Sequence, residues 1–476
     1  MLFQNRNSFS NATEKSNVRL KSSSVATKPF LFSSKKTAMN GLNKLNQTQA
    51  SSTIGQKSSF ISSSTKLNDK SLSSPLLLPN KSLSIPSYVS TSSSVSVKST
   101  ATAVKPAFPN APLDPRRVAP LLYFQNQRVH SLTEYGKDVI RSMSDWANKD
   151  LPRYLRSPKE MWQPSDLLPD PKDPYFLDQV RELRKESAKL SPEYFVVLVG
   201  DMITEEALPS YLNMINTLDE TRDETGASNT PWARWAREWT AEENRHGDIL
   251  NKYLYLSGRV DMHSVEITVQ RLISNGLDPK LENNPYLCFL YTSFQERATK
   301  VCHGSTARLA KDVENPALAK MCGLIASDES RHEMAYQAIV QQFFDRDPDG
   351  AMLAFADMMH KGITMPAHLL DDMWHPKNNP GSPGLFHDYS AVANRIGVYT
   401  TSDYADIVEY LVKKWKVADV KVESGEAAQA QEYLMQHSAR IRKLSNLQME
   451  RYRREQLKGK SRKVRFNWIH KEAVTI

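Results

Sequence analysis

Two short motifs in the sequence place a glutamate three residues before a histidine. Glu243 precedes His246 in the segment EENRHG, and Glu329 precedes His332 in the segment DESRHE. On a helix, this spacing brings both side chains to one face. A carboxylate and an imidazole on the same face can bind one divalent metal ion, so the two copies predict a metal site built from two helices.

Two more glutamates, Glu205 and Glu296, lie at matching depths in two other predicted helices. Each of the four helices is expected to begin at a proline, and the four glutamates lie 13, 12, 11 and 13 residues after these prolines. At a rise of about 1.5 Å per residue, their levels differ by roughly 3 Å. Neighbouring antiparallel helices would therefore bring four carboxylates into one layer.

The four helices that must carry these residues share one start signal. A capping residue stands directly before a proline at Ser191-Pro192, Thr230-Pro231, Asn284-Pro285 and Asn315-Pro316. Proline in the first helical position costs no hydrogen bond, and the capping side chain satisfies a free backbone N–H. We expect these helices to end at Leu218-Asp219, Gly258, Asp312 and Asp347-Pro348, with a kink at Pro209 in the first. This pattern predicts an all-α fold with a four-helix bundle over about residues 191–346 and further helices around it.

The residues around both motifs form apolar stripes, which favours burial over a solvated run of charge. In the fourth helix the stripe contains Leu318, Cys322, Ile325, Glu329, His332, Tyr336, Ile339 and Phe343, and in the second it contains Trp232, Ala236, Trp239, Glu243, His246, Leu250 and Tyr253. Buried carboxylates are costly unless they are paired or bind a metal. A salt-bridge cluster is the alternative, but the nearby arginines, Arg245 and Arg331, fall off the stripes.

The types of ligand also favour particular metals. Four carboxylates and two imidazoles, without a thiolate, suit iron or manganese better than structural zinc. One glutamate from each of two helices, together with Glu-x-x-His from each of two others, is the pattern of ferritin-like di-iron carboxylate proteins. We therefore expect a ferritin-like bundle that binds two iron ions (Fe²⁺) and activates dioxygen.

The first hundred residues differ in composition from the rest of the chain. They contain 27 Ser and 13 Lys or Arg but only two acidic residues, whereas residues 101–476 hold 49 basic and 51 acidic residues. The overall charge of +9 therefore comes from this leader and does not predict a nucleic-acid partner. A Ser-rich, acid-poor leader is typical of a plastid transit peptide, although a retained low-complexity tail has the same composition. We expect a leader over residues 1–100 and one catalytic domain over residues 101–476.

Two further features exclude other classes of protein. The sequence contains no uninterrupted apolar run of about 18 residues, so no membrane span is expected. The three cysteines, Cys288, Cys302 and Cys322, lack the spacing of a zinc or iron-sulfur site, and we expect them to be core residues in a reducing compartment.

Long stretches of the chain resemble the soluble plant acyl-acyl carrier protein desaturases. They include MWQPSDLLPDP, GDMITEEALPSY, WTAEENRHGDILNKYLYLSGRVDM, NPYLCFLYTSFQERAT, DESRHE and FADMMHKGITMPAHL. The resemblance implies a homodimer in the chloroplast stroma that binds two irons per subunit and receives electrons from reduced ferredoxin. It also implies an enzyme of fatty acid biosynthesis, which introduces a cis double bond at carbon 9 of a stearoyl or palmitoyl chain on acyl carrier protein (ACP).

The same resemblance assigns roles to individual residues. It implies that Glu205, Glu243, His246, Glu296, Glu329 and His332 are the iron ligands, while the adjacent Glu206 and Glu242 are not. Thr299 resembles a threonine near the oxygen-binding position; the alternative is a helix-internal Thr bonded to its own backbone. Trp162, Asp328 and His246 resemble a hydrogen-bonded chain from the surface to one iron, and an acceptor behind a ligating histidine makes physical sense.

A substrate tunnel is implied by residues that match the family's tunnel wall. They are Met214, Thr217, Leu218, Leu281, Cys288 and Phe289. Cys288 stands where stearoyl-type members typically carry Gly, and Leu281 stands where they typically carry Thr. Larger side chains shorten a packed tunnel, so we expect a shift toward a shorter chain or another bond position. The alternative is that either residue packs away from the tunnel.

Three other functions fit parts of the pattern. A ferritin-like iron-storage protein would explain the metal layer, but it needs no paired Glu-x-x-His. A ribonucleotide reductase small subunit would need a redox-active tyrosine near an iron, for which Tyr336 is a candidate. A helical interaction protein would explain the amphipathic helices but not the matched buried acids.

Overall fold

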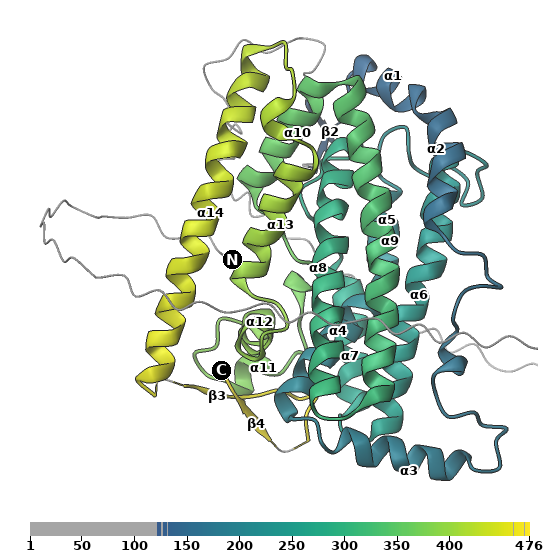
Figure 1. The fold of residues 1–476 in the computed structure, drawn as a ribbon, viewed down its shortest axis with the longest axis vertical. Helices are drawn as coiled ribbons and strands as arrows, with labels where there is room; N and C mark the ends of the chain where they lie inside the picture. The colour runs from purple at the N-terminus through teal and green to yellow at the C-terminus, as the bar shows by residue number, and fades with distance from the viewer. Residues whose placement is uncertain (1–120, 125–126, 131, 460, 471) are drawn as a thin grey trace, which may run out of the picture. The chain divides into compact units, whose positions relative to one another are not determined.

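The computed structural model describes residues 121–124, 127–130, 132–459, 461–470 and 472–476, and Figure 1 shows their arrangement. The predicted leader over residues 1–100 lies outside the described residues. Most of the described chain is helical. Two small antiparallel sheets are also present, with Leu121 opposite His130 in the first and Lys463 opposite Thr475 in the second. The predicted all-α class is confirmed.

The described helices and strands follow one another as fourteen α-helices between two hairpins. The α-helices are α1 Glu134–Ser142, α2 Ser144–Asp150, α3 Phe176–Ser187, α4 Pro192–Glu206, α5 Leu208–Ile215, α6 Pro231–Ser257, α7 Met262–Asn275, α8 Pro285–Asp312, α9 Pro316–Arg346, α10 Pro348–Lys361, α11 His375–Asn378, α12 Leu385–Ile396, α13 Thr401–Lys414 and α14 Gly425–Leu457. The strands are β1 Leu121–Phe124, β2 Gln127–His130, β3 Lys463–Arg465 and β4 Ala473–Thr475. Short 3₁₀ turns lie at Leu151–Tyr154, Pro164–Asp166, Pro366–Leu369 and Val417–Asp419.

The four predicted helix starts are confirmed at α4, α6, α8 and α9. The side chains of Ser191, Thr230, Asn284 and Asn315 each accept a hydrogen bond from a backbone N–H of the first turn. The predicted ends of three helices also agree to within one residue, and Gly258 closes α6 with a left-handed φ of 64°. Local capping chemistry therefore sets the frame of the bundle.

The first core helix is interrupted close to Pro209 instead of running as one kinked helix to Leu218. α4 ends at Glu206 and α5 begins at Leu208. Proline at 209 has no N–H for the carbonyl of Glu205, so the α-helical ladder stops there. The interruption leaves Glu205 in the last turn of α4, at the level of the other glutamates.

Two apolar clusters pack along the bundle, one on each side of the layer of acidic residues. The first includes Trp239, Phe289 and Phe343, and the second includes Tyr253 and Ile325. In Figure 1, α8 and α9 lie side by side in the middle, α6 lies next to them, and α10, α13 and α14 cover the opposite side. The acidic layer is thus enclosed by apolar packing above and below.

Both predicted stripes are buried, as expected. Every residue of the stripe on α9 is at most 2% exposed, and every residue of the stripe on α6 is at most 6% exposed. This burial removes water from Glu243 and Glu329, the acids on the two stripes, so their charge must be balanced by groups inside the bundle.

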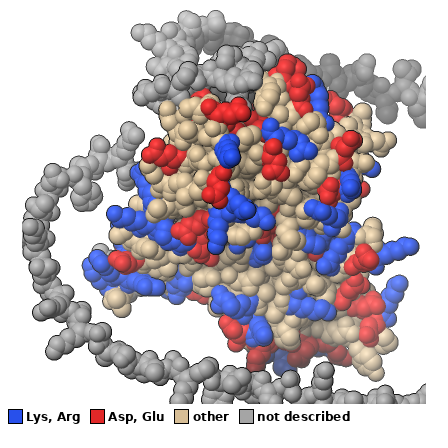
Figure 2. Space-filling model, turned by 45° about the horizontal axis from the view of Figure 1, so that its top comes forward, with Lys and Arg blue, Asp and Glu red and all other residues tan. Residues whose placement is uncertain are grey.

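The surface of the described domain carries charges of both signs. On the face shown in Figure 2, basic and acidic side chains are interspersed and no large patch of one sign stands out. This agrees with the near balance of charge after residue 100. Among the described residues, no helix combines the length and the apolar character that crossing a bilayer requires.

Candidate metal centre

The structure brings the six predicted ligands together in two overlapping groups. One group contains Glu205, Glu243, His246 and Glu329, and the other contains Glu243, Glu296, Glu329 and His332. In each group the candidate ligand atoms all lie within 4.8 Å of one another, and all the residues are buried. Glu243 and Glu329 belong to both groups. The geometry therefore fits two ions that share two carboxylates.

Both imidazoles turn the same nitrogen toward the acids. His332 Nδ1 lies 2.5 Å from Glu243 Oε1, and His246 Nδ1 lies 3.0 Å from Glu243 Oε2. His246 Nδ1 also lies 3.3 Å from Glu329. These contacts come from helical motifs on α6 and α9, whose i, i+3 spacing points each pair inward.

The electrostatics of the cluster favour a cation between these side chains. Burial, together with the charges of Glu243 and Glu329, raises the pKa of Glu296 well above its usual range, and burial also raises the pKa of Glu205. The neighbouring histidines hold the pKa of Glu243 far below its usual range, although burial opposes them. Four carboxylates so close together cannot all ionise without a positive charge among them.

Two atoms test whether a metal ion fits. Glu243 Oε1 and His332 Nδ1 are fully buried, and neither makes a hydrogen bond of acceptable geometry, although they lie 2.5 Å apart. Buried polar atoms without partners are rare in folded proteins, and an ion is one of the accepted explanations. The donor set and these two atoms therefore support a buried metal centre.

The outer nitrogen of each histidine faces a second acid. His246 Nε2 lies 3.5 Å from Asp328 Oδ2, and His332 Nε2 lies 3.0 Å from Glu242 Oε2. Such acceptors fix the ring orientation of a ligating histidine. The two halves of the centre are thus built alike, with the two acids lying outside the ligand layer.

Two arginines pair with these outer acids. Arg245 donates to Asp328 at 2.8 Å, and Arg331 donates to Glu242 at 2.6 Å. Both arginines lie off the ligand stripes, as the sequence indicated, yet Arg245 is only 6% exposed. The structure therefore contains salt bridges as well as the acid cluster, but they surround the cluster without neutralising it.

The predicted chain of Trp162, Asp328 and His246 is present as a set of contacts. Trp162 Nε1 donates to Asp328 Oδ2 at 3.0 Å, and the indole stacks on the His246 ring with centroids 6.1 Å apart. Trp162 is partly exposed, whereas His246 is fully buried. The contacts therefore run from the surface to the acid layer.

Thr299 shows features of both predicted roles, a hydroxyl near the oxygen-binding position and a threonine bonded to the backbone of its own helix. Its Oγ1 lies 2.6 Å from Glu329 Oε2, but it also lies 3.1 Å from the backbone carbonyl of Glu296. The hydroxyl therefore reaches a candidate ligand while remaining within reach of its own helix.

Two residues that the sequence did not indicate hold the two unshared carboxylates, Glu205 and Glu296. His303 Nε2 lies 2.8 Å from Glu205 Oε1, and Trp239 Nε1 donates to Glu296 Oε1 at 3.2 Å. His303 follows Glu296 by seven residues on α8, which is two helical turns, so the spacing could have indicated a shared face. Trp239 is on the stripe of α6, where its spacing indicates an apolar core residue and gives no sign of the hydrogen bond.

A cavity of about 70 Å³ opens directly beside the acids. Four of the candidate ligands line it, Glu205, Glu243, Glu296 and Glu329, together with Thr299. The rest of its wall comes from Thr204, Leu208, Tyr211, Met214, Ile215, Trp239, Leu277, Tyr291, Thr292, Gln295 and Pro366. An acidic layer open to a largely apolar wall suits an apolar substrate next to a metal centre.

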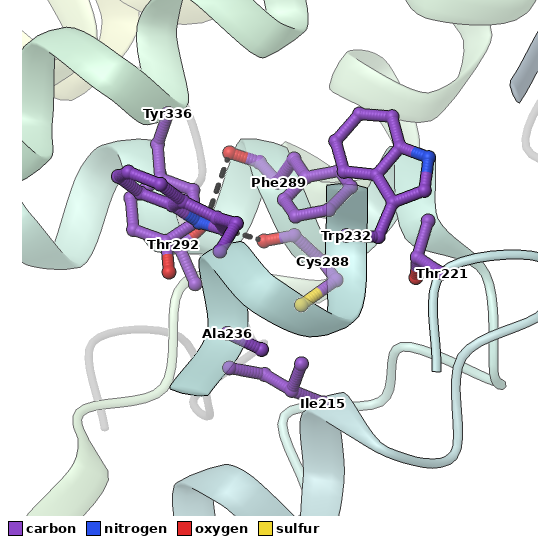
Figure 3. A pocket seen from close by; sticks show the side chains of 9 residues that line it. Ile215, Thr221, Trp232, Ala236, Cys288, Phe289, Thr292 and Tyr336 are labelled. Carbon is purple, nitrogen blue, oxygen red and sulfur yellow. Dashed lines mark hydrogen bonds between the residues drawn. The ribbon is translucent and has the colours of Figure 1, made fainter. Parts of the chain in front are cut away.

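A second cavity, of about 10 Å³, adjoins the first and is shown in Figure 3. Ile215 and Thr292 line both cavities. Of the six residues expected in the tunnel wall, Cys288 and Phe289 line the small cavity and Met214 lines the large one. Thr217, Leu218 and Leu281 line neither, and the last two are buried in the apolar core.

Residues 136–470 match the model of a protein family described as fatty acid desaturase. Stearoyl-acyl-carrier-protein 9-desaturase of Brassica napus is 55% identical over 350 residues, which cover 74% of this chain and 85% of the relative. A palmitoyl-acyl-carrier-protein 4-desaturase of Ophrys sphegodes is 51% identical over 361 residues, which cover 75% and 87%. Both relatives are described as chloroplastic.

Proposed function

This chain belongs to the fatty acid desaturase family, and we propose that it introduces a cis double bond into a saturated acyl chain carried on acyl carrier protein. One observation carries the proposal: a buried layer of four carboxylates and two imidazoles borders an apolar cavity. Both parts are required, since the carboxylates and imidazoles would hold the metal ions that activate dioxygen, and the cavity would present the acyl chain beside them.

The reaction class follows from the chemistry of the substrate. An unactivated methylene has no acidic proton, so a general base cannot start the reaction. Instead, two hydrogen atoms leave neighbouring carbons, and dioxygen takes them up with two electrons and two protons and leaves as two water molecules. When bound, a pair of iron ions supplies this oxidising chemistry.

The metal in this proposal is iron, with two ions per chain. Glu205 and His246 would hold one ion, Glu296 and His332 the other, and Glu243 and Glu329 would contact both. Oxygen and nitrogen donors without thiolate agree with iron, and the ligand pattern is that of di-iron carboxylate bundles.

The protein's own residues orient the ligands and keep water out. His303 and Trp239 hold the unshared carboxylates, and Thr299 reaches Glu329. Tyr211, Met214 and the other apolar residues of the large cavity position the acyl chain beside the acids. Exclusion of water protects the oxidising centre from side reactions.

The electrons enter along the contacts between Trp162, Asp328 and His246, with reduced ferredoxin as the donor. The partly exposed Trp162 gives a surface-bound donor access to a buried ligand. Two one-electron transfers through this route would prepare the centre for each turnover.

The enzyme works as a homodimer in the chloroplast stroma, where it contributes to fatty acid biosynthesis. The chloroplastic relatives support this location, and the Ser-rich segment over residues 1–100 would be the transit peptide. The catalytic domain then comprises residues 101–476, and its core is the bundle over about 191–346.

The acyl length is set by the far end of the cavities. The two relatives act on stearoyl and palmitoyl chains, according to their names, so either length is a candidate. Cys288 lines the small cavity, and its side chain takes up room there, which favours palmitoyl over stearoyl.

The test is product analysis with defined substrates. Iron-loaded protein lacking residues 1–100 is incubated with ferredoxin, its reductase, NADPH, oxygen, and palmitoyl-ACP or stearoyl-ACP. A monoene from either substrate supports the function, and mass spectrometry gives its length and bond position. Iron-loaded protein that consumes neither acyl chain would contradict the proposal, and a clear preference for stearoyl-ACP would contradict the role given to Cys288.

A further inference from the structure

The small cavity contains polar atoms that the proposed reaction does not use. Thr221 Oγ1 and Trp232 Nε1 are fully buried, and neither has a hydrogen-bond partner. Both residues line the cavity, and Figure 3 draws Thr221 on the same side of the view as the nitrogen-bearing edge of Trp232. The remaining wall is mostly apolar, with Phe289 stacked on Trp232 at a centroid distance of 5.6 Å.

Buried polar groups without a hydrogen-bond partner indicate that a ligand binds beside them. An indole N–H can only donate, and a hydroxyl can both donate and accept. Buried donors without acceptors are rare because each forfeits its bond with water. Trp235 Nε1 on the same wall is a third unpartnered donor, and its ring packs edge-on against Tyr336. Thr221 and Trp232 could both be satisfied by a single oxygen atom that accepts from Trp232 and exchanges a hydrogen bond with Thr221.

The size of the cavity matches one such atom. Its volume of about 10 Å³ is close to the minimum that a single water-sized group needs. The neighbouring thiol of Cys288 stays neutral because burial raises its pKa to about 12. No ionised side chain lines this cavity, so the group that fits is small, polar and uncharged.

The small cavity lies next to the large one, where the acyl chain is proposed to bind. Ile215 and Thr292 form a wall common to both cavities, while Leu277 and Pro366 lie on the large cavity and are partly exposed. An acyl chain that enters beside Leu277 and passes the acids would end against Ile215 and Cys288. Its last carbons would therefore face Thr221 and Trp232.

We propose that the small cavity binds one uncharged oxygen through Thr221 and Trp232, supplied by a hydroxyl on the far end of the acyl chain or by a water molecule. This inference rests on the proposed desaturase function, because it treats the cavity as the end of the substrate site. In the first case the enzyme prefers acyl chains hydroxylated at the far end. In the second case the bound water closes the end of the site and limits chain length.

Kinetics with matched substrates separate the two sources. kcat/KM is measured for palmitoyl-ACP and stearoyl-ACP and for their counterparts with a terminal hydroxyl, using wild type, Thr221→Val and Trp232→Phe. If the substrate supplies the oxygen, the ratio of hydroxylated to plain substrate falls roughly fivefold to tenfold in both variants, as expected for one lost neutral hydrogen bond. If water supplies it, the ratio stays constant and both variants change the relative use of the two chain lengths.

Thr292→Val is the matched control. Thr292 lines the same cavity, but its hydroxyl already contacts the backbone carbonyls of Cys288 and Phe289 at 3.1 and 3.3 Å. Its replacement should leave the substrate ratio at the wild-type value. If Thr292→Val changes the ratio as much as Thr221→Val does, the effect comes from the general polarity of the cavity. That result would contradict the proposal that Thr221 and Trp232 together bind the oxygen.

A high-resolution crystal structure of the full domain provides a readout that does not depend on catalysis. An oxygen within about 3.2 Å of both Thr221 Oγ1 and Trp232 Nε1 supports the inference even if no acyl-ACP is desaturated. The inference is overturned if that position holds an apolar carbon or no ordered atom, and if both variants keep the wild-type ratio of hydroxylated to plain substrate and the wild-type relative use of the two chain lengths.

Discussion

His303 Nε2 lies 2.8 Å from Oε1 of Glu205, and the two side chains are 2% and 9% exposed. The two residues come from different helices, α8 and α4, and only folding brings them together. Glu205 stands in the last turn of α4, directly before the interruption at Ala207, and His303 is the residue that hydrogen-bonds its carboxylate. The imidazole therefore supplies the constraint that fixes the carboxylate.

Replacing His303 tests this positioning role. In His303→Leu we expect one of the two ions to bind about 10 to 100 times more weakly, the range seen when a partner of a metal ligand is lost. His303→Gln, which can still donate, should recover part of that affinity. Metal content after gel filtration measures the number of bound ions, and titration with Co²⁺ under nitrogen measures their affinities. Two equally tight ions in a folded His303→Leu protein would contradict the role.

Local signals made the helix starts and the ligand layer predictable. Each start combines Ser, Thr or Asn with proline, and these residues act within a single turn. The ligands follow a helical period, so Glu243 and His246 could be assigned to one face without knowledge of the fold. The interruption at Pro209 was also local, although its extent, a full break at Ala207, depends on how α5 packs.

Contacts between distant segments could not be predicted in this way. His303 reaches Glu205, and Arg331 reaches Glu242, only because of how the four helices are arranged. The same holds for the tunnel: Cys288 lines a cavity while Leu281 is buried in the core, and nothing in the sequence distinguished them. The direction of a side chain in a packed core depends on all its neighbours.

The two adjacent glutamates on α4 provide a direct comparison. Glu205→Gln should remove one ion and reduce desaturation at least about 100-fold, because it is a candidate ligand. Glu206→Gln should remain within about twofold of wild type, because Glu206 is partly exposed and contacts Asn251 at 3.4 Å, away from the acids. Iron content and product yield of both variants are measured side by side. A loss of iron in Glu206→Gln but not in Glu205→Gln would reverse the assignment.

Metal affinity should depend on pH through the histidines. In the metal-free protein, the contacts with Glu243 and Glu242 raise the pKa of His332 to about 9, although burial opposes them. His332 is therefore protonated at pH 7 and must release a proton to bind a metal, so affinity should rise between pH 7 and about 9. Co²⁺ titration calorimetry in two buffers of different ionisation enthalpy measures the protons released. An affinity that is constant over this range would contradict the expected protonation.

Trp162→Phe separates electron entry from catalysis. Phenylalanine keeps a ring under Arg245, whose guanidinium carbon lies 4.3 Å from the indole centroid, but it cannot donate to Asp328. We expect reduction of the iron by ferredoxin to slow about tenfold, while reduction by dithionite and the iron content remain unchanged. Stopped-flow absorption measures both rates. Equal slowing with both reductants would indicate a damaged centre and contradict a specific route.

The packing of α12 on α4 leaves no room for a side chain at Gly200. A Cβ there would overlap the ring of Tyr389, whose hydroxyl donates to Asp201 at 2.9 Å. Gly200→Ala should therefore lower the free energy of unfolding by about 1–3 kcal/mol. Gly304→Ala is the control, because its new Cβ meets no atom and alanine favours helix by about 0.5–1 kcal/mol. The unfolding temperature should fall in Gly200→Ala and rise in Gly304→Ala. Equal shifts in the two variants would contradict a steric clash at Gly200.

We propose that six residues from four helices hold two iron ions. Anomalous diffraction at the iron absorption edge, from crystals of iron-loaded protein, would locate these ions. We expect two peaks, one beside Glu205 and His246 and the other beside Glu296 and His332, with Glu243 and Glu329 near both. No peak within this layer, or a single peak at full iron loading, would rule out this arrangement.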